Sequence, residues 1–405
     1  MLSFINKYRI QIAFNIILII GYVAFILGTG YPKDIAQITF WAPDSQAYRD
    51  VGDWIFGVRS MGWENLGARP FLYPVLLNLA RSIGGLYGIW GMQFIMWVVI
   101  ANCVGFCVWK LTRNPFLVGL ATLIFGSNIS LLLLTLHGLT EITASFLLSL
   151  YALVVVINRK NIFSTRVAPI LLLICSCMAV VRPVFVPFVA LATIIVILFW
   201  AWKRVRISAW IFLFLALFPI AIQMSLFKFH FGSWEVSGIG RNTLYDYYFS
   251  RVYAKVNEID VLNARKQVER FSKKDILSYC LLHREVAIKT YLNNFRDNIL
   301  SCSDFANAGE KRPILKWVLK KENRVYMFLH VIMVFPLFFH LIRWVKRKEW
   351  DQMILVLAFA VPMGMIFFSS PISFNQGDRL VLPAIPLWVI LYAFLMSKML
   401  EKKSI

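Results

Sequence analysis

The chain has 405 residues, of which 59% are apolar and 16% aromatic, and its mean hydropathy is +0.68. This composition excludes a water-soluble domain and indicates an integral membrane protein. The formal net charge is +21, but much of the Lys and Arg lies in short clusters between apolar runs, which is typical of cytoplasmic loops and argues against nucleic-acid binding. Six cysteines are too few for a disulfide framework.

The first apolar run, residues 10–27, follows a basic start and has no small-residue cleavage site, so we expect an uncleaved span rather than a signal peptide. The other expected spans are residues 88–109, 116–136 (broken near 126–128), 142–157, 167–181, 184–202, 209–229, 325–342, 353–368 and 380–396. Residues 71–83 form a shorter apolar run, which fits an interfacial or re-entrant helix. The sequence therefore predicts an all-α bundle of about ten transmembrane helices.

The basic clusters predict the orientation of this bundle. With ten spans, every short loop rich in Lys and Arg lies on the side of the N-terminus, so both termini are expected in the cytoplasm. The outer corners, residues 29–70, 137–141, 182–183 and 375–379, carry polar side chains capable of chemistry. We therefore expect the active face to lie outside the cytoplasm.

Three parts are predicted along the chain. Residues 1–229 form a membrane core whose first outer loop, residues 29–70, carries the candidate site. Residues 230–324 are hydrophilic, and their apolar positions have helical spacing, so we expect a small extracytoplasmic helical cap. Residues 325–405 contain the last spans. Cys280 and Cys302 both lie in the cap segment, and a disulfide between them is left open.

The first outer loop gathers acids next to one arginine. Asp44, Asp50, Asp53 and Glu64 precede Arg69, which leads into the short apolar run. The sequence APDS is also a plausible helix start, so the alternative is a solvated loop in which Asp44 only caps a helix. Because Asp50 and Asp53 are three residues apart, we expect a solvated helix face there rather than catalysis.

The outer corners together favour transfer of a group away from a phosphate. A carboxylate can take a proton from an alcohol, and arginines can hold a phosphate leaving group. Hydrolytic glycosidases instead need paired acid and base carboxylates. A sugar donor outside the cytoplasm would arrive on a lipid phosphate, since nucleotide sugars are normally absent there.

Each remaining candidate also has an ordinary structural interpretation. Glu141 could simply begin a helix, where acids are favoured. Arg182 and Arg379 could be interfacial anchors, although their position before proline-bearing runs favours phosphate binding. His137 is expected to be a satisfied polar corner rather than a metal ligand, and the chain has no metal-binding motif such as H-E-x-x-H.

Five motifs then carry a family resemblance. In chain order they are PDSQAY with Asp44, RPFLYPVLL with Arg69, HGLTEITASFLL with Glu141, VRPVFVP with Arg182, and DRLVLPAIPLWVIL with Arg379. With these motifs the chain resembles the GT-C superfamily of membrane glycosyltransferases, near the protein O-mannosyltransferases and the aminoarabinose transferases. The resemblance covers nearly the whole membrane part. It departs at Ser45, where mannosyltransferases have Glu, and at Arg69, where the aminoarabinose enzymes have Lys.

The resemblance implies a GT-C-like bundle in the bacterial inner membrane, a polyprenyl-phosphate sugar donor, and inversion at the anomeric carbon. It implies that Asp44 is the catalytic base and that Arg69 meets the donor phosphate, and we expect Arg182 or Arg379 to help hold this phosphate. Glu141 would position a substrate or help to bind a divalent cation, and the acceptor would be a saccharide, a lipid or a protein. Further supporting candidates are Asp50, Asp53, His137, Arg241, Tyr48 and Tyr73.

Three other functions stay open at this point. The first is a polymerase or ligase of lipid-linked glycans. The second is a flippase or transporter, although the chain shows no internal repeat and its polar residues collect at one face. The third is a structural assembly protein, which would not need acids and arginines to converge.

Overall fold

A computed structural model describes residues 2–60, 62–301, 313–374 and 376–400 of the chain. Within these residues all regular secondary structure is helical. Six helices are long and apolar enough to cross a membrane, and there is a seventh if the bent pair α10 and α11 counts as one span. The prediction of a helical membrane protein is thereby confirmed. The other three predicted spans form shorter apolar helices, α5, α7 and α8, so the count of ten spans stays a prediction.

The N-terminal half contains eleven of the α-helices. They are α1 (Leu2–Thr29), α2 (Ile35–Thr39), α3 (Pro43–Ile55), α4 (Leu72–Thr112), α5 (Pro115–Gly126), α6 (Ile129–Leu134), α7 (Glu141–Ile157), α8 (Val167–Val181), α9 (Val186–Trp202), α10 (Ile207–Ala216) and α11 (Phe218–Phe231). Short 3-10 turns, η1 (Tyr31–Asp34), η2 (Trp63–Gly67) and η3 (Pro183–Phe185), join them at the corners.

The C-terminal half contains the cap and the last long helices. The cap consists of α12 (Ile239–Asn242), the π-helical turn η4 (Thr243–Phe249), α13 (Ser250–Asn257), α14 (Val261–Val268), α15 (Lys273–Leu282) and α16 (Arg284–Leu300). After it come α17 (Pro313–Arg347), α18 (Trp350–Ser369), η6 (Ser370–Ile372), η7 (Gly377–Leu380), η8 (Leu382–Ala384) and α19 (Ile385–Leu400). Cys280 is half-buried in α15, and Cys302 lies outside the described residues.

Local sequence signals explain where the membrane helices break. Gly84 and Gly85 interrupt α4, and Gly85 adopts φ 60° and ψ −140°, a conformation that residues with a side chain rarely reach. The interruption separates residues 72–83, the predicted interfacial or re-entrant helix, from the following span. Between α5 and α6, the Asn128 side chain accepts a bond from the Leu131 N–H and starts the second helix, as the Gly-Ser-Asn sequence predicted.

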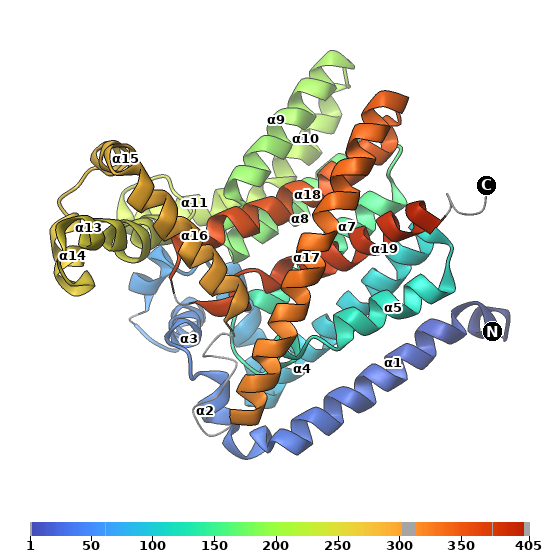
Figure 1. Ribbon diagram of the computed structural model, residues 1–405, viewed down its shortest axis with the longest axis horizontal. Coiled ribbons are helices and arrows are strands. Elements are labelled where there is room, and N and C mark those ends of the chain that lie inside the picture. The colour runs from blue at the N-terminus through green and yellow to red at the C-terminus, as the bar shows by residue number, and fades with distance from the viewer. Residues whose placement is uncertain (1, 61, 302–312, 375, 401–405) are drawn as a thin grey trace.

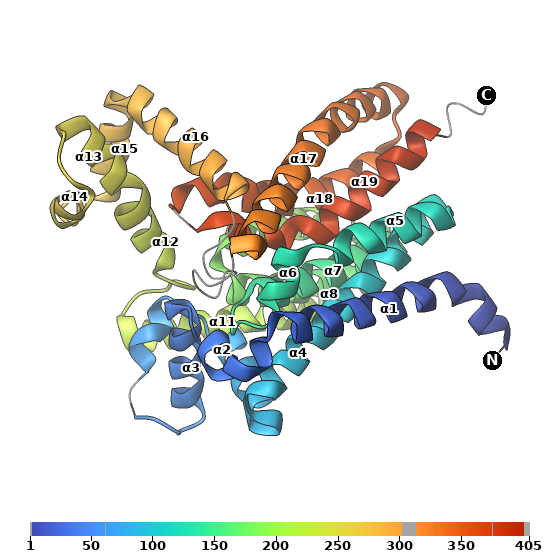
Figure 2. The ribbon, with the colours of Figure 1, turned by 60° about the horizontal axis from the view of Figure 1, so that its bottom comes forward.

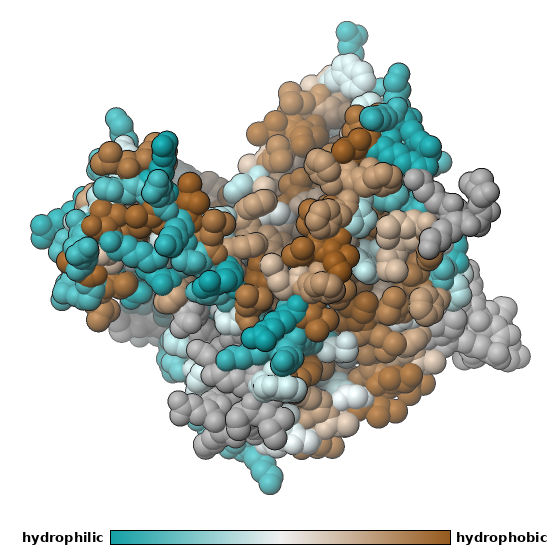
Figure 3. Space-filling view, viewed as in Figure 1, coloured by the Kyte–Doolittle hydropathy of each residue, from teal (hydrophilic) through white to brown (hydrophobic). Residues whose placement is uncertain are grey.

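The helices surround a core made by α4, α5, α7 and α19. The spanning window of α19 is 78% buried, whereas the windows of α1 and α17 are 11% buried. The N-terminal part of α1 and the C-terminal part of α19 lie on one side of the molecule, and the cap helices α13–α16 lie on the opposite side (Figures 1 and 2). The visible surface is largely apolar over the middle of the bundle and carries a mixture of hydrophilic and apolar residues over the cap (Figure 3). Because the exposed faces of the long helices are apolar, they are suited to lipid.

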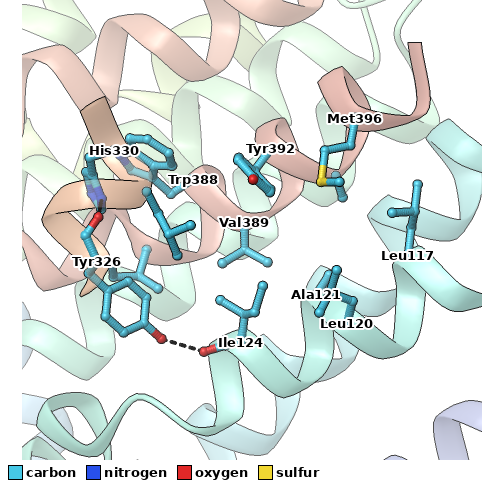
Figure 4. Close-up of a pocket in the computed structure, with 13 residues that line it drawn as sticks. Leu117, Leu120, Ala121, Ile124, Tyr326, His330, Trp388, Val389, Tyr392 and Met396 are labelled. Atoms are coloured by element: carbon cyan, nitrogen blue, oxygen red, sulfur yellow. Dashed lines mark hydrogen bonds between the residues drawn. The ribbon is translucent and has the colours of Figure 1, made fainter. Parts of the chain in front are cut away.

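The long helix α17 corrects one predicted boundary. Span eight was expected to begin at residue 325, but α17 is already helical from Pro313, so the predicted end of the cap lies inside this helix. α17 packs on α5 and α19 around a small apolar cavity of about 30 Å³ (Figure 4). The Tyr326 hydroxyl donates to the Ile124 carbonyl at 2.6 Å, and the His330 ring lies 3.7 Å from the Trp388 ring between centroids.

Candidate functional site

Asp44 lies in the first turn of α3, in the segment between α2 and α4. The helix begins at Pro43, whose fixed φ suits a first helical position, and Ala42 occupies the N-cap without a side-chain bond. The Asp44 carboxylate does not cap this helix. Its Oδ1 accepts a hydrogen bond from Arg69 Nη2 at 2.5 Å, and its Oδ2 accepts one from Arg379 Nη2 at 2.7 Å. The structure therefore supports the ion-pair interpretation of Asp44 rather than the capping one.

The two arginines come from distant parts of the chain. Arg69 follows η2, donates to the Ala68 carbonyl at 3.2 Å, and lies with its guanidinium carbon 5.3 Å from the centre of the Tyr48 ring. Arg379 lies in η7, 335 residues after Asp44, and its Nη2 also donates to the Gln376 side chain at 2.5 Å. Arg379 is only 7% exposed, so its charge acts in a poorly solvated environment.

The charges in this cluster shift the protonation of its members. Burial alone would raise the pKa of the Asp44 carboxyl, but the charges of Arg379 and Arg69 outweigh burial and hold this pKa below its ordinary value. Burial would lower the pKa of Arg379, while the charges of Asp44 and Glu141 raise it overall. The site at rest is therefore one carboxylate neutralised by two cations, with a second carboxylate close enough to act on Arg379.

Glu141 and two tyrosines complete the surroundings of Asp44. Glu141 begins α7, is buried, and its Oε2 has no hydrogen-bond partner among the described residues. Tyr48 lies one helical turn after Asp44 on the same face of α3, and its ring meets the ring of Tyr73 edge-on at 5.0 Å. Burial, with the charges of Asp44 and Glu141, raises the pKa of the Tyr48 phenol above its ordinary value, so this hydroxyl stays protonated.

His137 lies on the loop before α7 and is fully buried. Its backbone carbonyl accepts from Gln93, and the following Gly138 N–H donates to the Thr39 carbonyl, which ties the loop to α2 and α4. Burial lowers the pKa of its imidazole to about 4, so His137 is neutral at pH 7. His137 lies at a buried polar corner, but its Nδ1 has no hydrogen-bond partner among the described residues, so the expected satisfied corner is not fully formed. The neutral ring adds no cation for phosphate binding.

Asp50 and Asp53 do not join Asp44. Asp53 is nine residues further along α3, which turns it by about 180° to the opposite face. There it forms an ion pair with Arg81 of α4, while Asp50 pairs with Arg59 at 3.0 Å. Asp53 is 4% exposed, so the predicted solvated face is wrong for this residue. Its paired burial fixes α3 on α4, because a buried carboxylate needs a partner.

Two predicted phosphate or supporting arginines lie outside the Asp44 ion pairs. Arg182 ends α8, and its Nη1 is buried with no hydrogen-bond partner among the described residues. Arg241 lies in α12 of the cap, with its guanidinium carbon 5.4 Å from the centre of the Tyr245 ring. Neither forms an ion pair with an acid in the part of the chain that the structure describes.

Sequence reasoning missed the amides that position Arg379. Asn298 of α16 donates to the Ser370 and Ser373 carbonyls at 2.9 and 2.8 Å and accepts from the Gln376 N–H at 3.3 Å. Asn294, one turn earlier, donates to the Pro371 carbonyl at 2.9 Å. Both asparagines are fully buried. The four-residue spacing of two Asn on one helix face is the only signal in the sequence that could have identified them.

A divalent cation does not fit the residues at this site. Both Asp44 oxygens already accept bonds from guanidinium groups. Within the described ranges no group of three or more His, Cys, Asp or Glu side chains could hold a metal ion. Positive charge at this site comes from arginines.

Comparison of the chain with protein-family models, with curated proteins and with solved structures finds no match.

Proposed function

We propose that the protein is a membrane glycosyltransferase that moves a sugar from a polyprenyl-phosphate donor to an acceptor hydroxyl on the extracytoplasmic side of the membrane. One observation carries this proposal: the Asp44 carboxylate is bound by Arg69 and Arg379, with the buried Glu141 nearby. A base beside two cations at the rim of an apolar bundle suits a lipid whose phosphate is the leaving group. The ten-span GT-C architecture belongs to the same proposal.

In the proposed reaction, the acceptor oxygen attacks the anomeric carbon while Asp44 takes the hydroxyl proton. The bond between the anomeric carbon and the phosphate oxygen breaks, and the electron pair leaves with the polyprenyl phosphate. Arg69 and Arg379 stabilise the negative charge that develops on that phosphate. Attack from the side opposite the phosphate inverts the anomeric configuration. Asp44 then releases its proton to water.

The resting ion pairs give the donor a second role. Without a ligand, both guanidinium groups are bonded to Asp44, which lowers its basicity. A donor phosphate competes for the same groups, and as the arginines turn to the phosphate the pKa of Asp44 rises. The base therefore becomes stronger when the leaving group is in place.

Two unsatisfied buried groups are available to a ligand: Glu141, whose charge acts on Arg379, and Arg182, which the sequence also marks for phosphate binding. The Nη1 of Arg182 and the Oε2 of Glu141 are both buried without a partner among the described residues. A buried polar atom left unpaired costs about 1–3 kcal/mol. A phosphate oxygen would satisfy the arginine, and a substrate hydroxyl would satisfy the carboxylate.

A transfer assay tests the proposal. Purified protein is incubated with radiolabelled polyprenyl-phosphate sugars and a membrane extract, and wild type is compared with Asp44→Asn and Asp50→Asn. We expect label in a new product with wild type and Asp50→Asn, because Asp50 faces away from the site, and none with Asp44→Asn. Transfer by Asp44→Asn at the wild-type rate would refute the mechanism. Movement of lipid-linked sugar between leaflets without transfer would instead indicate a transporter.

A further inference from the structure

A larger cavity lies next to the carboxylate–arginine site, between the first outer loop, the end of α11 and the cap. Its volume is about 580 Å³, within the range of small-molecule sites. Gly67 and Ala68 form part of its wall, and the next residue is Arg69, which binds Asp44. A ligand in this cavity is therefore held against the segment that carries the proposed phosphate ligand.

Hydrogen bonds fix the two sides of this cavity to each other. The Gly67 carbonyl accepts from the Gly238 N–H at 2.7 Å and from the Ser237 hydroxyl at 3.1 Å. The buried Gln223 of α11 accepts from the Phe71 N–H at 3.0 Å and donates to the Val236 carbonyl at 2.9 Å. The base of the cap and the loop before α4 thus form one continuous wall.

Aromatic rings line part of this wall. Phe231, at the end of α11, lies against Gly67, where a Cβ would come within 3.1 Å of the ring. Tyr245 and Phe271 of the cap also line the cavity, and the Tyr245 hydroxyl donates to the Phe271 carbonyl at 2.9 Å, which holds the two together. Such rings offer flat apolar faces that can cover the C–H face of a sugar ring.

The polar lining carries both signs of charge. Glu64 and Glu235 oppose Arg241 and Lys273, so the formal charges cancel. A phosphorylated or acidic ligand would need an excess of positive charge. A lipid chain would need an apolar lining throughout. Donors and acceptors mixed with aromatic faces suit a ligand that has many hydroxyls and no net charge.

We infer that this cavity binds a neutral saccharide and that this saccharide is the acceptor. The role of this saccharide as acceptor rests on the proposed function, but its binding to the cavity does not. It narrows the acceptor from a saccharide, a lipid or a protein to a neutral sugar chain.

Binding to the full-length protein in lipid nanodiscs tests the inference separately from catalysis. The neutral probes are maltotriose, lactose and chitobiose, and the comparison ligands are cellobiouronic acid and a Ser-Gly peptide. Binding of each ligand is measured by saturation-transfer NMR. The variant in the cavity is Phe231→Ala. The matched control is Phe229→Ala on the same helix, since Phe229 is 83% exposed and does not line the cavity.

We expect at least one neutral saccharide to bind, and Phe231→Ala to weaken it by roughly three- to tenfold. Phe229→Ala should bind as wild type, and Asp44→Asn should keep saccharide binding while losing transfer. Binding that persists in a protein without transfer activity would leave the cavity assignment standing and refute only the proposed function. Preference for the peptide or the acidic sugar, no binding of any neutral probe, or equal binding by Phe231→Ala and Phe229→Ala would overturn the inference.

Discussion

Replacing Asp44 by Asn should make the protein bind polyprenyl phosphate more tightly while abolishing transfer. In the resting site, both arginines donate to the Asp44 carboxylate, at 2.5 and 2.7 Å. A donor phosphate must therefore compete with an anion already in place. Asparagine keeps the shape of the side chain but is a neutral and weaker acceptor, so it leaves the arginines available for phosphate.

The magnitude follows from the bonds that the phosphate displaces. A hydrogen bond to a charged group contributes about 1.5–3 kcal/mol net, which corresponds to roughly ten- to a hundredfold in Kd. The Asp44 side chain is 27% exposed, so solvent screening places the gain near the lower end, at about tenfold. The same change should destabilise the unliganded protein by about 3 kcal/mol, because two poorly solvated cations lose their counter-charge.

Two measurements check this prediction. Calorimetry with a short polyprenyl phosphate gives Kd for wild type, Asp44→Asn and the control Asp53→Asn at one fixed salt concentration. Thermal unfolding with and without the ligand gives the stabilisation, which should be larger for Asp44→Asn than for wild type. Asp53→Asn should also lose stability, since Asp53 is paired with Arg81, but should bind phosphate as wild type does.

Weaker or unchanged phosphate binding in Asp44→Asn, beside normal binding in Asp53→Asn, would show that Arg69 and Arg379 do not hold the phosphate. The competition between carboxylate and donor would then be wrong, whatever the transfer assay shows.

Three further predictions follow from the same geometry. The pKa of Asp44 is lowered on folding, so its ion pairs stabilise the protein fully above the ordinary pKa of about 3.9 and this stabilisation is lost as pH falls through the lowered pKa. Unfolding scans should therefore show a difference in stability between wild type and Asp44→Asn that is constant from neutral pH to about pH 4 and becomes smaller below it. Asn298→Ala removes three hydrogen bonds to the loop before Arg379, so it should lower the stability by about 2–4 kcal/mol and raise the KM for the donor. The control Asn263→Ala, on an exposed cap helix, should change neither quantity. Equal KM values for the two variants would contradict a positioning role of Asn298. Arg182→Gln should weaken the binding of polyprenyl phosphate by about tenfold in calorimetry, and the control Arg166→Gln, at the other end of α8, should not weaken it. Equal effects of the two substitutions would show that Arg182 acts only through the overall positive charge.

The sequence predicted the helices well because length and hydropathy decide them. The interruptions of the helices near residues 84–85 and 126–128 could also be predicted, because Gly adopts unusual backbone conformations and Asn caps helix starts. The start of α17 was missed because Lys320, Lys321 and Glu322 resemble a loop by hydropathy. Hydropathy indicates where a helix enters the apolar layer, while the helix itself continues through residues with high helical propensity.

The membership of the site was only partly predictable. Polar residues at span ends pointed to Asp44, Arg69 and Arg379, and these three form ion pairs. Arg182 and Arg379 look alike in sequence, each before a proline-bearing run, and only the packing of the helices decides which one reaches Asp44. Asp53 is buried because it forms an ion pair with Arg81. Arg81 lies in a mostly apolar run, so hydropathy alone does not indicate that its long side chain would reach an acid.

The distance along the chain between Asp44 and Arg379 has a consequence for synthesis. The bond between them closes a separation of 335 residues, and α19, which follows Arg379, has the most buried of the spanning windows. During translation, Asp44 and the buried Glu141 enter the membrane region long before Arg379 and α19 are made. Until then α4, α5 and α7 lack the helix that they enclose, and the acids lack that cation. A chain that ends before η7 would therefore lack both Arg379 and the buried helix α19, and we expect it to be less stable than the full-length protein.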